Sequence, residues 1–370
     1  MKVRTTEVFI NNIKKLHKDN IINGHNFAKK ANLVYAETNS RDFFGNIDKN
    51  NIHYYKKNID NSITYSIKNF VLFENDIIFC KTDFLFELFS KLKDVKNLKN
   101  IKLITHQSAL PSIDARLYKL KPKCISEWYS INLATSKKSL FSIPLGLGNP
   151  FSNVTLKIEY FIKYYKTFIS ESPKNLIYAN FRNYSNYERE EMYSILIKNP
   201  NFFYEEPNLS LKMYFNKLLE YQYIFSPKGL GIDTHRFWES LYLARVPVAK
   251  FNTNYREFED YFIPYQKIED INKNNFKEII FDDKLAKLLN IDFWFDKISK
   301  NKIISDNCYT FVTTKKNYIN ELKLKRKYTR YKILKSNLSF KAKIHFFYRV
   351  IKEIHVNNYN QKFFERFWYS

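Results

Sequence analysis

The stretch 225-FSPKGLGIDTHRFWESLYLARVPVAK-250 contains, in order, an apolar run, a glycine loop, a helical pattern and a second apolar run. Pro227 ends the first run, because proline lacks the backbone N–H that a strand needs. A helix is expected over about 234–244 and a strand over 246–250. This order predicts a β-α-β unit of an α/β fold with a mostly parallel sheet.

Two of the six glycines in the chain, Gly229 and Gly231, lie in this loop. Glycines let the backbone take positive φ values and approach a ligand closely. Asp233 or Thr234 can cap the helix that follows. A glycine loop that opens onto a helix N-terminus favours an anionic ligand such as a diphosphate.

Charged residues surround the glycines. Lys228 and Arg236 would add positive charge, and an arginine in the first helical turn opposes the helix dipole, so stability alone does not explain Arg236. His235, Arg236 and Glu239 are spaced to share one helix face, where Glu239 could accept the hydroxyls of a ribose. The alternative is an ordinary strand–helix junction with a surface ion pair. The spacing is that of neither a GxGxxG fingerprint nor a Walker A loop.

Strands and helices alternate over much of the chain. Expected strands lie at 101–107, 140–148, 175–181 and 223–227, and expected helices at 123–133, 187–198 and 209–222. We therefore predict two α/β domains, 1–165 and 166–305, followed by a basic, aromatic helical tail at 306–370.

The charge of the chain has two interpretations. Sixty-one Lys and Arg against 37 Asp and Glu give a net charge of +24, which indicates either a solvated lysine surface or attraction to an anionic partner. The three cysteines are far apart and form no CxxC pair, which argues against a disulfide frame or a zinc site. No secretory leader and no apolar run of membrane-span length are visible, so a cytoplasmic location is expected.

The tail carries much of the positive charge. Residues 321–370 contain thirteen Lys or Arg and three Asp or Glu, interleaved with aromatic and aliphatic residues. One interpretation is a helical extension packed on the body of the protein. The other is a basic amphipathic anchor that lies peripherally on the anionic inner face of a membrane.

The run SPKGLGIDTHRFWESLYLARVPVAK resembles the C-terminal signature of exostosin-like glycosyltransferases, S-P-x-G-x-G-x-D-T-x-R-x-W-E. The resemblance implies a GT-B fold, in which two Rossmann-like domains face each other across a cleft and the C-terminal one holds a sugar nucleotide. It places Gly229, Gly231 and Arg236 near the diphosphate and Glu239 on the ribose. The rest of the expected substrate-binding set is Arg182, Arg189, Lys228, Asp233 and His235.

A weaker resemblance lies upstream, in 103–133 and 143–150, which are similar to the N-terminal half of related transferases. There, a strand that ends in His-Asn-x-Asp is followed by Trp, Asn and Ile-Pro-Ile-Gly. The chain keeps His106 at the strand end but has HQSA in place of the full motif. We expect either His106 or Asp114 to be the catalytic base, which must reach the acceptor hydroxyl.

Together these features predict a glycosyltransferase. It would move a sugar from a nucleotide-sugar donor, expected to be a UDP-sugar, to a cell-surface polysaccharide, lipopolysaccharide or glycolipid acceptor. Fixed cations would do the task of a metal, and no cofactor is expected. The acidic pair 282-DD-283 is interpreted as a helix cap. Two alternatives stay open: a basic nucleic-acid-binding protein, although no such motif is present, and a membrane-associated scaffold that has lost catalysis.

Overall fold

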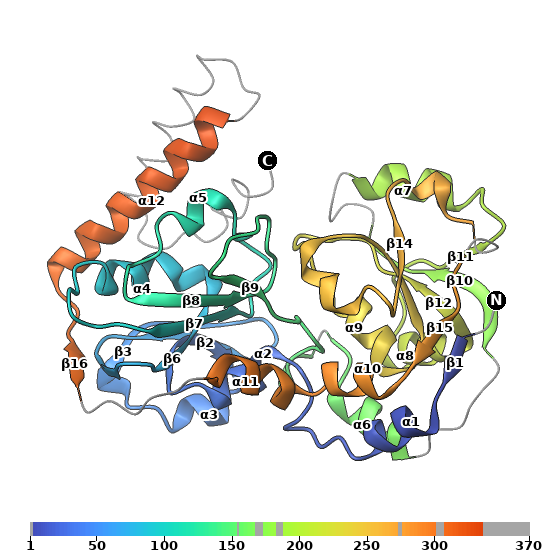
Figure 1. Cartoon of the computed structure of the whole chain (residues 1–370), viewed down its shortest axis with the longest axis horizontal. Helices are drawn as coiled ribbons and strands as arrows, with labels where there is room; N and C mark the ends of the chain where they lie inside the picture. Colours follow the sequence, from blue (N-terminus) through green and yellow to red (C-terminus); the bar gives the residue numbers. More distant parts are fainter. Residues whose placement is uncertain are drawn as a thin grey trace.

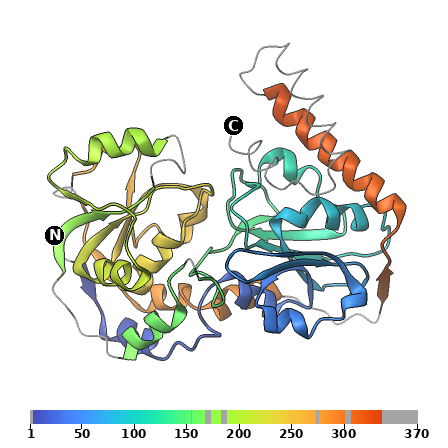
Figure 2. The same ribbon diagram turned by 180° about the vertical axis from the view of Figure 1, so that it is seen from behind.

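Two β-sheets organise the structure, a computed structural model that describes residues 3–153, 155–166, 173–182, 188–272, 276–300 and 307–335. Helices pack against each sheet, and the two sheets lie in different halves of the molecule (Figure 1). The view from behind shows the same division (Figure 2). The chain is therefore an α/β protein with parallel sheets, as its sequence predicts.

The first sheet is mixed and occupies the half drawn in blue and cyan (Figure 1). Its parallel strands, in spatial order, are β2 (Leu33–Asn39), β6 (Ile77–Lys81), β7 (Ile101–His106), β8 (Ile125–Ser130) and β9 (Leu140–Ser142). Beyond β2, the sheet continues antiparallel through β4 (Ile63–Ile67) and β3 (Ile52–Lys57). The helices of this half are α2 (Gly24–Lys30), α3 (Arg41–Gly45), α4 (Leu85–Leu92) and α5 (Ala115–Tyr118).

The segment 123–133 contains a strand and not the helix that its sequence predicts. Within it, β8 pairs in parallel with both β7 and β9. Ile125, Trp128 and Ile131 recur every three residues, which imitates a helix face. All three are buried, because β8 lies between two strands and its residues pack on both faces of the sheet. Periodicity alone does not separate these two cases.

The second sheet is entirely parallel within the described residues. Its strands, in spatial order, are β11 (Phe202–Tyr204), β10 (Lys174–Ala179), β12 (Tyr221–Phe225), β13 (Val246–Lys250) and β14 (Ile263–Tyr265). The helices that accompany it are α7 (Glu188–Leu196), α8 (Leu211–Glu220) and α9 (His235–Tyr242). The unit β12–loop–α9–β13 confirms the predicted β-α-β order, and Trp238 and Leu241 of α9 are fully buried.

The first residues of the chain lie with the second sheet, not with the first domain to which the sequence assigns them. β1 (Val3–Thr5) pairs in parallel with β15 (Ile279–Phe281). The following helix, α1 (Glu7–Lys14), contacts α6 (Ile158–Lys166) and α10 (Asp283–Leu288). Phe9 drives this placement, because its ring is fully buried and packs 5.6 Å from the ring of Phe281.

The later part of the chain returns to the first sheet. α11 (Ile291–Ser299) contacts α2, and β16 (Cys308–Phe311) pairs antiparallel with β5 (Phe70–Phe73). The long helix α12 (Lys315–Lys335) then runs along α4 (Figure 1). The expected tail therefore begins with a strand and continues as a helix that packs on the body.

The proposed membrane anchor falls largely on residues 336–370, which lie outside the described residues. In the part of the chain that the structure describes, no helix combines the length and the apolar character needed to cross a membrane. The predicted cap at 282-DD-283 is confirmed, since Asp282 accepts a hydrogen bond from the Leu285 N–H at the start of α10.

Candidate functional site

A cavity of about 610 Å³ lies between the two sheets and is lined by residues from both. Gln107 follows the end of β7, Asn132 follows β8, Asn180 follows β10, and Gly229 belongs to the loop after β12. The carboxyl ends of parallel strands from two sheets thus open onto one space. Ligands of open α/β sheets bind at this edge, so the cavity is the candidate site.

Arg189 holds the backbone of the loop after β12. The Arg189 guanidinium donates to the carbonyl oxygens of Pro227 and Lys228, each at 2.9 Å. Burial, together with the charge of Arg236, lowers the pKa of Arg189 to about 10. Although Arg189 lines the cavity as the sequence predicts, its guanidinium is engaged with backbone carbonyls, and its evident role is to shape the loop.

The two loop glycines do not take the positive φ values that the sequence predicts, and the structure gives a reason only for Gly231. Neither has a positive φ, and among the glycines that the structure describes only Gly146 does. A Cβ on Gly231 would lie 2.8 Å from the Asn132 side-chain oxygen, whereas one on Gly229 would make an ordinary 3.4 Å contact with Arg189. Gly231 is therefore dictated by the close approach of Asn132 from the first sheet.

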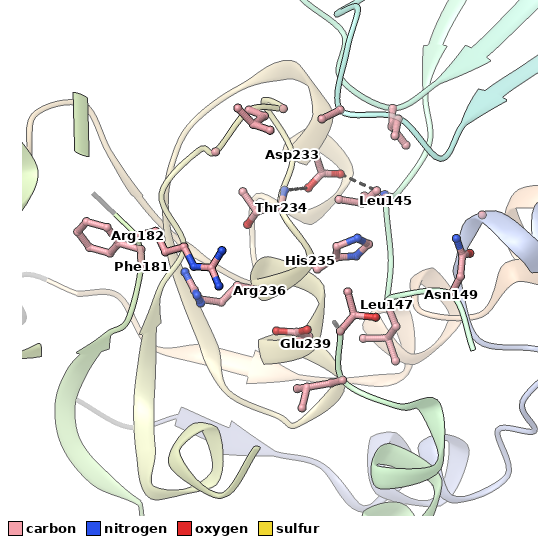
Figure 3. Close-up of a pocket in the computed structure, with 18 of the residues that line it drawn as sticks. Leu145, Leu147, Asn149, Phe181, Arg182, Asp233, Thr234, His235, Arg236 and Glu239 are labelled. Carbon is pink, nitrogen blue, oxygen red and sulfur yellow. Dashed lines mark hydrogen bonds between the residues drawn. The ribbon is translucent and has the colours of Figure 1, made fainter. Parts of the chain in front are cut away.

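Asp233 ties the start of α9 to the first sheet. Its carboxylate accepts from the Thr234 N–H at 2.7 Å and from the Leu145 N–H at 3.1 Å (Figure 3). It also accepts from Trp238 Nε1 at 2.8 Å. Its own N–H donates to Asn132 Oδ1 at 2.9 Å. Burial raises the pKa of Asp233 to about 7. Thr234 is the N-cap residue of α9, although its side chain makes no capping hydrogen bond.

The first turns of α9 present charged groups to the cavity, and Tyr214 of α8 links two of them. Arg236 Nε donates to the Tyr214 hydroxyl at 3.0 Å, and that hydroxyl donates to Glu239 Oε2, also at 3.0 Å. Burial raises the pKa of the Glu239 carboxyl, while His235 and Arg236 act in the opposite direction. His235, Arg236 and Glu239 all line the cavity, so the predicted shared face is confirmed.

Two further residues expected to bind the substrate, Arg182 and Lys228, differ in where they lie. Arg182 lines the cavity, on the same side as Arg236 in Figure 3. Lys228 is not among the lining residues, because its ammonium pairs with Glu188 Oε1 at 2.6 Å. The prediction of Lys228 as a ligand group is therefore corrected: it belongs to an ion pair beside the loop.

Neither residue expected as the catalytic base fits that role. His106 is buried, its Nδ1 accepts from the Gln107 N–H at 2.7 Å, and its Nε2 lies 3.3 Å from the Pro144 carbonyl oxygen. Burial lowers the pKa of His106 to about 3, so the ring is neutral. These contacts with the backbone occupy both of its nitrogens. Asp114 does not line the cavity; it caps α5 and pairs with Arg116 at 2.7 Å.

Sequence reasoning missed several polar groups of the cavity. Tyr214 carries no local signal, because it comes from a different helix. Gln107 and Asn132 lie in the upstream stretch that resembles related transferases, where the resemblance keeps Asn132, but the sequence does not mark them as binding residues. Both have left-handed backbone conformations, with φ of 63° and 56°. Such residues gather at functional sites, where the surrounding structure holds the strain. Among the described residues, Gln107 Nε2, Thr155 Oγ1 and Thr234 Oγ1 are buried lining atoms without a hydrogen-bond partner, so they can serve a ligand.

The described residues contain no group of three or more His, Cys, Asp or Glu that could hold a metal ion. The positive charge among the lining residues comes from arginine side chains, and the N-terminus of α9 adds to it. No protein-family model matches the chain, and a search of curated proteins found no match.

Proposed function

We propose that the chain is a GT-B-type glycosyltransferase of the exostosin-like kind, which transfers a sugar from a nucleotide-sugar donor to a glycan or glycolipid acceptor. The observation that carries the proposal is the Arg236–Tyr214–Glu239 cluster, which lies in the cavity at the start of α9. A cation and a carboxylate about one helical turn apart suit the phosphate and the ribose of a nucleotide.

The electrostatics of the cluster supports this assignment. Arg236 faces the cavity in the first turn of α9, where its charge adds to the positive end of the helix dipole. Arg182 adds a second cation to the lining. When the bond between the sugar and the diphosphate breaks, negative charge develops on the diphosphate. Fixed cations in a partly water-excluded site stabilise that charge, and such stabilisation is a large catalytic term.

The opposite wall of the cavity suits an acceptor that carries hydroxyl groups. Asn149 and Leu147 lie on the other side of His235 from the two arginines (Figure 3). Gln107 and Asn132 add further neutral amides to the lining, and Leu145 adds an apolar side chain. Amide groups donate to and accept from sugar hydroxyls, while the leucines can pack against a sugar ring. A volume of about 610 Å³ lies within the range of small-molecule sites, about 300–1,000 Å³.

The proposal is tested by calorimetric titration of the full chain with UDP, GDP, CMP and TDP. We expect one of these nucleotides to bind and Arg236→Ala to weaken its binding by about 100-fold, which corresponds to about 2.7 kcal/mol. Arg256→Ala removes an exposed arginine and is the matched control, expected to bind like the wild type. If none of the four nucleotides binds to the wild-type chain, the proposal is wrong.

A further inference from the structure

The imidazole of His235 is oriented by a backbone carbonyl from the half of the molecule that contains the first sheet. His235 Nδ1 lies 2.8 Å from the carbonyl oxygen of Gly146. A carbonyl only accepts, so Nδ1 carries the proton and donates it, and Nε2 of the neutral ring keeps its lone pair. Gly146 itself is fixed, with φ of +68° and with room for no Cβ, which would lie 2.0 Å from the Ile22 oxygen. The ring is therefore held in one tautomer.

The lone pair of His235 is available in the cavity. His235 is a partly exposed lining residue, and no residue in the described ranges is seen to hydrogen-bond its Nε2. Figure 3 shows its ring in the middle of the site, with Arg236 and Arg182 on one side and Leu147 and Asn149 on the other. The ring thus stands between the wall that suits a diphosphate and the wall that suits an acceptor.

The other titratable groups near His235 are already engaged. His106 of β7, which interacts electrostatically with His235, has both nitrogens bonded to the backbone. Asp233 shares its oxygens among three protein donors. Glu239 and Arg236, on the same helix, are joined through Tyr214. Among these groups, His235 combines a defined tautomer with an unshared basic atom.

We infer that His235 is the general base of the proposed transfer reaction, an inference that rests on the proposed function. His235 Nε2 takes the proton of the acceptor hydroxyl as the acceptor oxygen bonds to the anomeric carbon. The bond from that carbon to the diphosphate breaks at the same time, and the diphosphate leaves with the electron pair toward Arg236. The imidazolium then returns its proton to water. Attack opposite the leaving group inverts the anomeric configuration.

The test follows release of sugar to water, which takes the place of the acceptor hydroxyl. The donors are UDP-glucose, UDP-N-acetylglucosamine, GDP-mannose and TDP-glucose, and the first anomer released is identified by proton NMR. We expect the wild-type chain to hydrolyse one of them with inversion. His235→Asn keeps an N–H for the Gly146 carbonyl but lacks a basic nitrogen. It should lose about 10²- to 10⁴-fold in turnover while it binds the nucleoside diphosphate about as well as the wild type.

A second variant, His235→Ala, tests whether the side chain of His235 acts as a base or only fills space. His235→Ala should be as slow as His235→Asn, and added imidazole should restore part of its turnover by filling the vacated space. His17→Ala removes an exposed histidine and should behave like the wild type with and without imidazole.

Four results would overturn the inference: retention of configuration, unchanged turnover in His235→Asn, parallel loss of binding and turnover, or a wild-type chain that binds a donor but releases no sugar. Parallel loss would make His235 a phosphate ligand instead. Failure of the proposed function is a different result, since the wild-type chain would then bind none of the nucleotides.

Discussion

Two strand ends meet at the cavity and are built in different ways. After β7, Gln107 is held by groups from neighbouring strands of the same sheet, the Lys81 ammonium of β6 and the Thr38 N–H of β2. His106 bonds to the backbone of Gln107 and Pro144. After β12, the loop is held by Arg189 from α7 and by Asn132 from the other sheet. The difference teaches that the strand end after β12 depends on side chains from outside its own sheet. Single substitutions should therefore damage it most.

The largest expected effect on stability comes from Arg189. Arg189→Met would leave the buried carbonyl oxygens of Pro227 and Lys228 without their donor. We expect the free energy of unfolding to fall by about 3 kcal/mol, because buried polar groups that lose their partners keep their desolvation cost. Urea denaturation, followed by tryptophan fluorescence, measures the change. Arg256→Met, at an exposed site, is the control; an equal effect in both variants would contradict the assigned role.

The next effect concerns the contact between the two strand ends. Gly231→Ala would place a Cβ against the Asn132 amide and should cost about 2 kcal/mol, whereas Gly229→Ala should stay within about 0.5 kcal/mol. The same urea denaturation measures both. In the double variant Gly231→Ala/Asn132→Gly, the steric part of the cost should disappear. Equal costs at Gly229 and Gly231 would show that the Asn132 contact does not matter.

The smallest expected effect on stability concerns His106, at the end of β7. In the unfolded chain, His106 is protonated below its ordinary pKa of 6.5, whereas burial in the folded protein lowers its pKa to about 3. The unfolded chain thus binds more protons between these values, so stability falls as the pH falls. Between pH 7 and pH 5 the loss is at most about 2 kcal/mol.

His106→Asn should remove this part of the pH dependence, and urea denaturation at pH 5 and pH 7 measures it. Asp233 acts in the opposite direction over the same range. Its raised pKa makes the folded protein bind more protons than the unfolded chain, so its contribution to stability falls as the pH rises. Asp233→Asn should therefore change the pH dependence of stability in the direction opposite to His106→Asn. A pH dependence that is unchanged in His106→Asn would refute the assignment to His106.

The sequence predicts the parts of the site that lie within one local unit. The β12–α9–β13 order and the common face of His235, Arg236 and Glu239 follow from spacing along the chain. Tyr214 could not be predicted in this way, because only tertiary packing brings α8 to that face.

The role of Arg189 could not be read from the sequence either. An arginine bonded to loop carbonyls and an arginine that faces a ligand look alike in a sequence. Gln107 is similar, since glutamine has no preference for the left-handed conformation that it adopts. The same limit applies to β8, where burial on both faces hid the period of two that marks many strands.

The pairing of β1 with β15 bears on how the protein is made. Residues 3–14 are synthesised well before their partners near residue 280. During that interval the strands β2 to β9 can already assemble, while Phe9 and its neighbours on α1 lack the surface that covers them. Contacts between such distant parts of a chain form slowly because a long loop must close first. The half of the molecule that contains the second sheet can therefore be completed only after the chain near residue 280 has been made.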